Sequence, residues 1–187
     1  MKRIKQIIQD STGFTLAETL LAILILLMVS TIVATGIPAA KNAYEKVVLA
    51  SNAEVLLSTT MSELRNELGT ARDVKQEQNE AGQVIGLSYR NSYTSSESKL
   101  FKSSGGDDPA GTIMLQRYAG EGGSKALRLV SEKASDGLYV LYGTVDYNSS
   151  TGIVTFHNLQ VMRKSSANPL AEMDNFPIRV FSADKNS

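Results

Sequence analysis

One long stretch without charge constrains this chain more than any other feature. From Thr19 to Ala40 there are 22 residues with no Asp, Glu, Lys or Arg, and the only polar side chains among them are four hydroxyls. As a helix this stretch would be about 33 Å long at roughly 1.5 Å per residue, which matches a bilayer hydrocarbon core of about 30 Å. The sequence therefore predicts one transmembrane helix.

The residues before this stretch predict its orientation. Lys2, Arg3 and Lys5 lie on the N-terminal side, and basic residues next to a membrane segment tend to stay in the cytoplasm. The chain from Lys41 onward is then extracytoplasmic. We expect a single-pass membrane protein whose C-terminal region lies outside the cytoplasm.

A cleaved secretory signal is the competing interpretation of this N-terminus. Such signals also begin with basic residues, but their apolar core is usually about 7–15 residues and ends in a small-x-small cleavage site. The stretch here is longer, although Ala34-Thr35-Gly36 offers such a site. Glu18 separates the two interpretations, because a carboxylate at the start of a membrane segment is costly and points to a function.

The residues around this carboxylate form a motif, Gly13-Phe14-Thr15-Leu16-Ala17-Glu18. It resembles the N-terminus of the type IV pilin and pseudopilin superfamily, whose precursors share a glycine, a following phenylalanine, a Thr-Leu pair and a glutamate five residues into the mature chain. The resemblance covers about the first forty residues, and the short charged leader and the apolar helix agree with it as well.

The resemblance implies how the chain is processed and assembled. A prepilin peptidase would remove the leader, residues 1–13, by cutting between Gly13 and Phe14, and would methylate the new amino group of Phe14. Glu18 of one subunit would then pair with that amine on a neighbouring pilin or pseudopilin subunit. The implied partners are the peptidase, an inner-membrane assembly platform, other subunits and membrane lipid.

The charges differ on the two sides of the implied cleavage site. Three of the 19 basic and one of the 19 acidic residues lie in the leader, which leaves 16 basic and 18 acidic residues in the mature chain. The leader therefore has a net charge of +2 and the mature chain −2. A neutral total gives no indication of a nucleic-acid partner, since phosphate binding needs an excess of Lys and Arg. The chain has no cysteine, which excludes disulfides and thiolate sites.

The helix is expected to continue past the membrane segment. Gly36 and Pro38 predict a kink or local melting near residues 34–38, because proline removes a helical hydrogen bond and clashes with the preceding turn. We predict a transmembrane and assembly segment over 14–40 and an amphipathic continuation over 41–74. Its apolar stripe consists of Val47, Ala50, Leu57, Met61, Leu64 and Leu68. Gly69 is the expected stop.

The remaining region, residues 75–187, predicts a β-rich extracytoplasmic domain. Lys75–Gln83 is polar and is expected to be a loop. Short β-like runs follow at Val84–Tyr89, Lys99–Lys102, Thr112–Tyr118, Ala126–Ser131, Leu138–Tyr147, Ile153–Lys164 and Phe176–Ser182. Turns are expected at 148–152 and 119–124. The predicted fold is α+β, a long helix packed on an antiparallel sheet, in the lollipop shape of pilins.

Nothing in the β-rich region predicts catalysis, a metal site or a cofactor. His157 is the only histidine, and we expect it to be structural or on the surface. Asp107 and Asp108 lie in a glycine-rich loop whose oxygens suit Ca²⁺ in type, but the spacing does not match an EF-hand. We expect a solvated loop there. The chain is thus predicted not to be an enzyme.

The leading hypothesis is a structural subunit, a minor pilin or minor pseudopilin, that forms a cell-surface or periplasm-spanning filament. A weaker similarity to larger minor subunits rests on Glu63–Leu68. The alternatives are a pseudopilin of a type II secretion or DNA-uptake machine, a membrane-anchored extracellular binding protein that does not polymerise, and a secreted enzyme with an unusual signal. Neighbouring genes for an assembly ATPase with a retraction ATPase, for a secretin or for a competence channel would identify the machine.

Overall fold

The computed structural model describes residues 15–80, 82–91, 97–117, 126–131, 137–164 and 166–181. Among these residues, helix α2 (Leu16–Gly69) precedes the strands. The chain divides into two compact units, Met1–Val47 and Val48–Ser187. We call them the N-terminal and C-terminal units, and α2 contributes to both.

Helix α2 is continuous through the position where melting was expected. Residues 34–38 are helical, and Pro38 lies inside the helix. Local melting at Gly36 and Pro38 is therefore not seen, because the surrounding turns keep their hydrogen bonds and proline removes only one. Whether the helix axis bends there remains a prediction. The helix ends at Gly69, the predicted stop.

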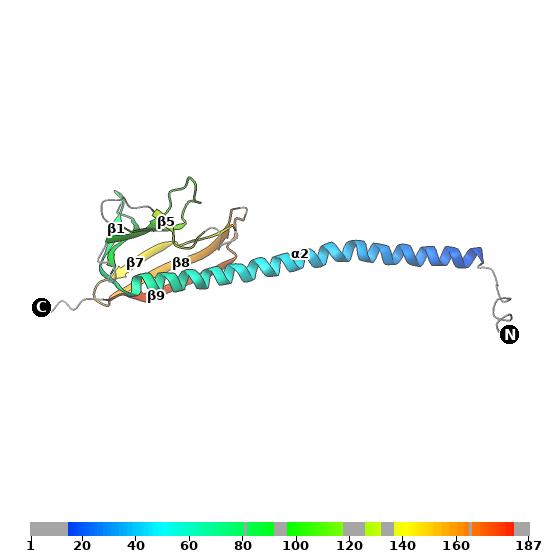
Figure 1. Cartoon of the computed structure of the whole chain (residues 1–187), viewed down its shortest axis with the longest axis horizontal. Helices are drawn as coiled ribbons and strands as arrows, with labels where there is room; N and C mark the ends of the chain where they lie inside the picture. The colour runs from blue at the N-terminus through cyan, green and yellow to red at the C-terminus, as the bar shows by residue number, and fades with distance from the viewer. Residues whose placement is uncertain are drawn as a thin grey trace, which may run out of the picture. The chain divides into compact units, whose positions relative to one another are not determined.

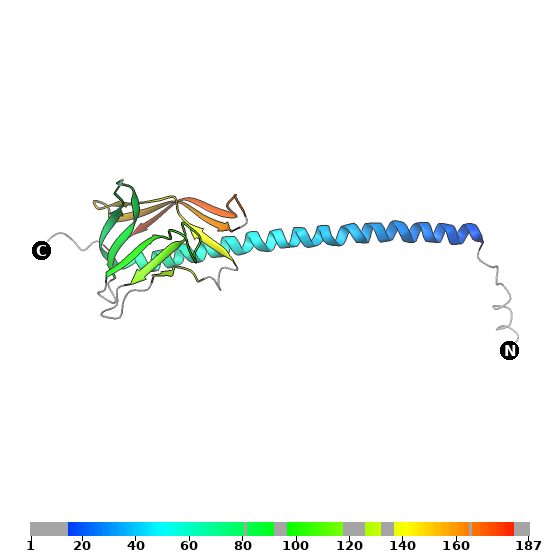
Figure 2. The same cartoon turned by 90° about the horizontal axis from the view of Figure 1, so that it is seen from above.

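The strands form two antiparallel sheets in the C-terminal unit. The first sheet has the order β1-β2-β3-β4-β5, and in the second β8 lies between β9 on one edge and the successive strands β6 and β7 on the other. The first sheet contains β1 (Ala71–Gln78), β2 (Val84–Asn91), β3 (Glu97–Lys102), β4 (Ile113–Arg117) and β5 (Ala126–Arg128). The second contains β6 (Leu138–Leu141), β7 (Thr144–Asn148), β8 (Ile153–Arg163) and β9 (Ala171–Arg179). Figure 2 shows the two sheets in green and in yellow to red.

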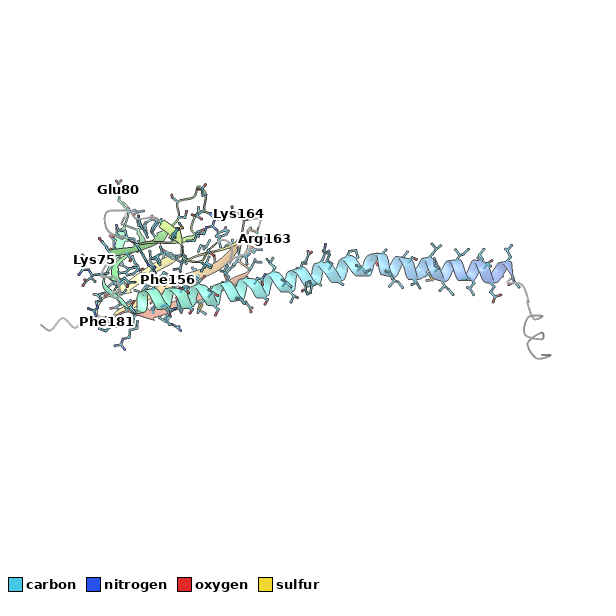
Figure 3. All side chains as sticks on the ribbon, viewed as in Figure 1. Lys75, Glu80, Phe156, Arg163, Lys164 and Phe181 are labelled. Carbon is cyan, nitrogen blue, oxygen red and sulfur yellow. The ribbon has the colours of Figure 1, made fainter. Side chains whose placement is uncertain are left out.

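The C-terminal part of α2 packs against these sheets, so the predicted α+β class is confirmed. Figure 1 shows this part of α2 alongside β8 and β9, and the guanidinium of Arg65 lies 5.5 Å from the ring centroid of Phe176 in β9. One hydrophobic core joins helix and sheets; its largest fully buried side chains include Tyr89, Tyr142 and Phe156. Phe156 is labelled in the interior in Figure 3.

The predicted helical stripe was partly wrong. Leu57, Leu64 and Leu68 are buried as expected, but Val47 is 68% exposed and Ala50 is exposed too. The buried face instead consists of Ala53, Leu56, Leu57, Thr60, Leu64, Glu67 and Leu68. It includes two polar residues, which a stripe defined by hydrophobicity alone leaves out.

The strand predictions need two corrections. The first four residues of the region predicted as a loop, Lys75–Gln78, are strand, since β1 runs from Ala71 to Gln78. Its polar sequence forms a strand because β2 pairs with it at the edge of the sheet. The amphipathic helix predicted over 41–74 therefore ends earlier, at Gly69. The other predicted strands lie within a few residues of observed ones, except Leu138–Tyr147, which is divided into β6 and β7.

The division of that strand coincides with an unusual residue in β8. Asn158 has φ of 52°, a left-handed conformation that asparagine tolerates better than most residues. Burial alternates as Val154 and Phe156 before Asn158 and as Leu159 and Val161 after it. The alternation therefore changes phase at Asn158. This residue lies between the part of β8 that pairs with β7 and the part that pairs with β6.

The predicted turn at 148–152 is confirmed as the β7–β8 hairpin. The amide of Gly152 donates to the carbonyl of Asn148 at 2.9 Å, and the side chain of Asn148 accepts from Ser150 and Thr151. The second predicted turn, 119–124, lies outside the described residues.

Candidate functional site

The candidate site at the membrane boundary begins where α2 begins. The amide of Glu18 donates to the carbonyl of Thr15 at 3.0 Å and to its hydroxyl at 3.3 Å. Thr15 therefore occupies the N-cap, and Glu18 is the acidic residue of the first turn, where the helix dipole favours a carboxylate. Thr15 and Glu18 have the spacing of a capping box. Gly13 and Phe14 lie outside the described residues.

The polar side chains of the uncharged stretch are all satisfied within the helix. Each of the four hydroxyls donates to a carbonyl three or four residues earlier: Thr19 to Leu16, Ser30 to Leu26, Thr31 to Met28 and Thr35 to Thr31, at 2.7–2.9 Å. In a hydrocarbon medium an unpaired hydroxyl is costly, so this pairing suits a segment that is surrounded by lipid or by apolar helices.

The large apolar side chains of the same stretch are exposed all around the helix. Their exposed fractions run from 49% at Leu24 to 69% at Ile32, and Figure 3 shows them projecting freely. A helix of this length and composition can cross a membrane once. Since an apolar surface on every side is unfavourable in water, this part of α2 needs lipid or other helices around it.

A second polar site lies at the other end of α2, on a residue that the sequence placed off the buried stripe. Glu67 is buried, with 8% exposure. One carboxylate oxygen accepts from the hydroxyl of Tyr89 at 2.9 Å and from the amide of Asn91 at 3.3 Å. The other accepts from Arg117 Nη2 at 2.6 Å. The carboxylate thus joins the last turn of α2 to strands β2 and β4.

This network raises the pKa values of Tyr89 and Arg117. Burial, together with the negative charge of Glu67, holds the pKa of Tyr89 well above its usual value. The hydrogen bond that Arg117 donates to the carboxylate of Glu67 raises the pKa of Arg117. Tyr89 therefore stays a neutral donor and Arg117 a cation, which is what a buried carboxylate requires. The signal that could have identified Glu67 is its helical spacing from Leu64 and Leu57, since all three lie on one face.

Of the remaining predicted residues, His157 and Asp108 make structural contacts, and Asp107 is exposed. His157 lies between β7 and β9, with Nδ1 2.6 Å from Asn175 Oδ1 and Nε2 3.0 Å from Asp146 Oδ2. In the glycine-rich loop, the carboxylate of Asp108 is paired with the guanidinium of Arg128. Among the residues that the structure describes, no three His, Asp or Glu side chains gather to hold a metal ion.

A scan of protein-family models, a search of curated proteins and a search of solved structures find no match to this chain.

Proposed function

We propose that this chain is a structural subunit of a type IV pilus or a related filament. It is inserted as a precursor, cleaved after Gly13, N-methylated at Phe14, and assembled through the apolar part of α2. The observation that carries the proposal is the position of Glu18, a carboxylate in the first turn of an apolar helix and five residues after Gly13.

The side chains of the apolar part of α2 support this proposal. An apolar helix whose hydroxyls are satisfied internally is stable in lipid before assembly and equally stable among other apolar helices afterwards. A carboxylate within such a bundle needs a cation, because an unpaired buried charge costs several kcal/mol. The amine that cleavage creates at Phe14 of a neighbouring subunit supplies it.

The N-terminus of the protein purified from membranes tests this proposal. Mass spectrometry should find a chain that begins at N-methylated Phe14. A chain that begins between Gly36 and Lys41 would indicate an ordinary secretory signal, and an uncut chain would indicate a membrane-anchored binding protein. Either result contradicts the proposal.

Two glycine variants provide a matched control. Gly13→Val should block cleavage, because a β-branched side chain hinders the extended backbone from entering the protease cleft. Gly36→Val should be cleaved normally, because a side chain at Gly36 meets nothing within 4 Å.

A further inference from the structure

A groove of about 670 Å³ opens in the C-terminal unit, between the first sheet and strand β7. One wall comes from the start of β2 and the end of β3, and includes Ile85 and Lys102; the other wall is the run Gly143–Asp146. Its volume falls within the range of ligand sites, which is roughly 300–1,000 Å³. The candidate sites described above do not use this groove.

The second wall is a strand edge. The run Gly143–Asp146 ends with the first three residues of β7, so the groove lies at the start of this strand. Strand β7 pairs with β8 along its other edge. Within the described residues no strand pairs with the edge of β7 that borders the groove. This edge can therefore accept the backbone of an extended peptide.

The first wall contributes a cation. Lys102 Nζ donates to the carbonyl of Gly143 and lies 4.6 Å from the ring centroid of Tyr142. Burial lowers the pKa of Lys102, which means that its charged form lacks part of its hydration. No carboxylate in the described part of the chain forms an ion pair with it. A carboxylate of a bound ligand would form an ion pair with Lys102 and so stabilise its charged form.

An apolar side chain, that of Ile85, lines the same groove as Lys102, and the two residues flank the Gly86–Phe101 pair of β2 and β3. Ile85 is 44% exposed although it belongs to the same groove. A ligand that covers Ile85 and places a carboxylate on Lys102 must have an apolar group close to its charge. A peptide that ends in an apolar residue has this combination, since its last side chain and its terminal carboxylate are attached to the same carbon.

We propose that this groove binds the free C-terminus of an extended peptide. The terminal carboxylate pairs with Lys102, the last side chain covers Ile85, and the peptide backbone adds a strand to the free edge of β7. The proposal does not depend on filament assembly.

The test uses the full-length protein in detergent micelles and a pool of fluorescent hexapeptides. The peptides are randomised at the first five positions and end in Val, Ile, Leu or Phe, with either a free carboxylate or an amidated terminus. By fluorescence anisotropy, the free-carboxylate pool should bind about tenfold or more tightly than the amidated pool, as expected for a charge-assisted contact. Absence of binding, or equal binding of the two pools, overturns the proposal.

Two lysine variants locate the contact. Lys102→Met should abolish the preference for a free carboxylate. Lys99→Met is the matched control and should keep it, because Lys99 points to the opposite face of β3 and pairs with Glu77 at 3.5 Å. Retention of the preference in Lys102→Met contradicts the assignment.

Two further probes, applied to the unchanged protein, keep the test independent of how the variants fold. Peptides N-methylated at alternate residues should lose binding in one of the two possible registers and keep it in the other, because only alternate amides face the β7 edge. Equal binding of both registers excludes strand addition. Displacement of the peptides by decanoate at equal concentration would show a small-carboxylate site instead, and would overturn the peptide proposal.

Discussion

Two glutamates of α2 show how strongly surroundings decide the role of a carboxylate. Glu18 is exposed in the first turn, where the helix dipole favours it. Glu67 is buried in the last turn, where the dipole opposes it, and it is held by Tyr89, Asn91 and Arg117. The first is free to pair with another molecule, whereas the second is committed within the fold.

Two substitutions of Glu18 distinguish the pairing role from the capping role. Glu18→Ala should leave membrane insertion intact but reduce incorporation into filaments by about tenfold or more, because the neighbour's amine is left unpaired. Glu18→Gln keeps the capping box and removes only the charge, so it should fail in the same way. Incorporation is measured by counting filaments and by subunit pull-down.

The control for Glu18 is Glu45→Ala, which removes an exposed glutamate 3.7 Å from Lys41. Such a surface pair contributes little, so incorporation should be normal. If Glu18→Gln also assembles normally, the carboxylate acts only as a cap and the pairing model is wrong.

Glu67→Ala should lower the free energy of unfolding of the C-terminal unit by about 2–3 kcal/mol, because it removes the acceptor of the buried Tyr89 hydroxyl and the contacts with Asn91 and Arg117. Relief of the unfavourable dipole offsets only a part of this loss. Urea unfolding followed by near-UV circular dichroism measures the change. Glu63→Ala, at an exposed position one turn earlier, should shift the free energy by no more than about 0.5 kcal/mol. Similar losses in both variants would mean that the network does not stabilise the fold.

At the scale of elements, the second sheet is organised around one level of β8. Gly143, between β6 and β7, donates from its amide to the carbonyl of His157 at 2.8 Å. A Cβ at Gly143 would lie 3.2 Å from that oxygen and from Asn158 Cβ. The gap between β6 and β7, the glycine in it and the left-handed Asn158 are thus parts of one irregularity. On one side of this irregularity the even-numbered residues of β8 point into the core, and on the other side the odd-numbered residues do.

Asn158→Val should therefore lower the free energy of unfolding by about 1–3 kcal/mol, since a β-branched residue is strained at positive φ. Asn158→Gly should be neutral or slightly stabilising, because glycine adopts this conformation readily. Thr155→Val, in a regular part of β8, is the control and should change little. The same urea titration measures all three, and an equal effect of Val and Gly at 158 would exclude backbone strain as the cause.

At the scale of the whole molecule, the two units make opposite demands on their surroundings. The N-terminal unit exposes its apolar side chains and needs lipid or other helices, whereas the C-terminal unit buries its own core. The stability of the C-terminal unit therefore depends on its own core, and titration of groups buried in that core should change it.

Alkaline pH should destabilise the C-terminal unit. Burial holds the pKa of Tyr142 above its usual value of 10.0, as it does for Tyr89. Below pH 10 both the folded and unfolded chains keep these protons; above it only the unfolded chain releases them, so stability falls as pH rises. Each such tyrosine contributes a slope of about 1.4 kcal/mol per pH unit.

Tyr142→Phe should remove one such contribution from the decline in the free energy of unfolding between pH 10 and 11. Tyr139→Phe is the control three residues earlier, in β6, where the side chain is only half-buried, and should change the decline less. Urea titrations at several pH values measure both. An unchanged slope in Tyr142→Phe would show that this hydroxyl ionises freely in the folded state.

The sequence by itself determined the features that depend on neighbours along the chain. The uncharged stretch predicts the helix, Gly69 predicts its end, and the Asn148–Gly152 turn predicts a hairpin, because each depends on local periodicity or backbone preference. The motif from Gly13 to Glu18 is also local, and its processing remains a prediction.

Only the tertiary structure decided the features that depend on distant partners. The polar β1 became a strand because β2 lies beside it, and Glu67 became a core residue because β2 and β4 bring Tyr89 and Arg117 to it. The groove beside β7, and the β7 edge that no strand pairs with in the described part of the chain, arise only when the two sheets pack. Hydrogen bonds and charges compensate buried polar groups across long sequence distances, and hydrophobic periodicity contains no record of such partners.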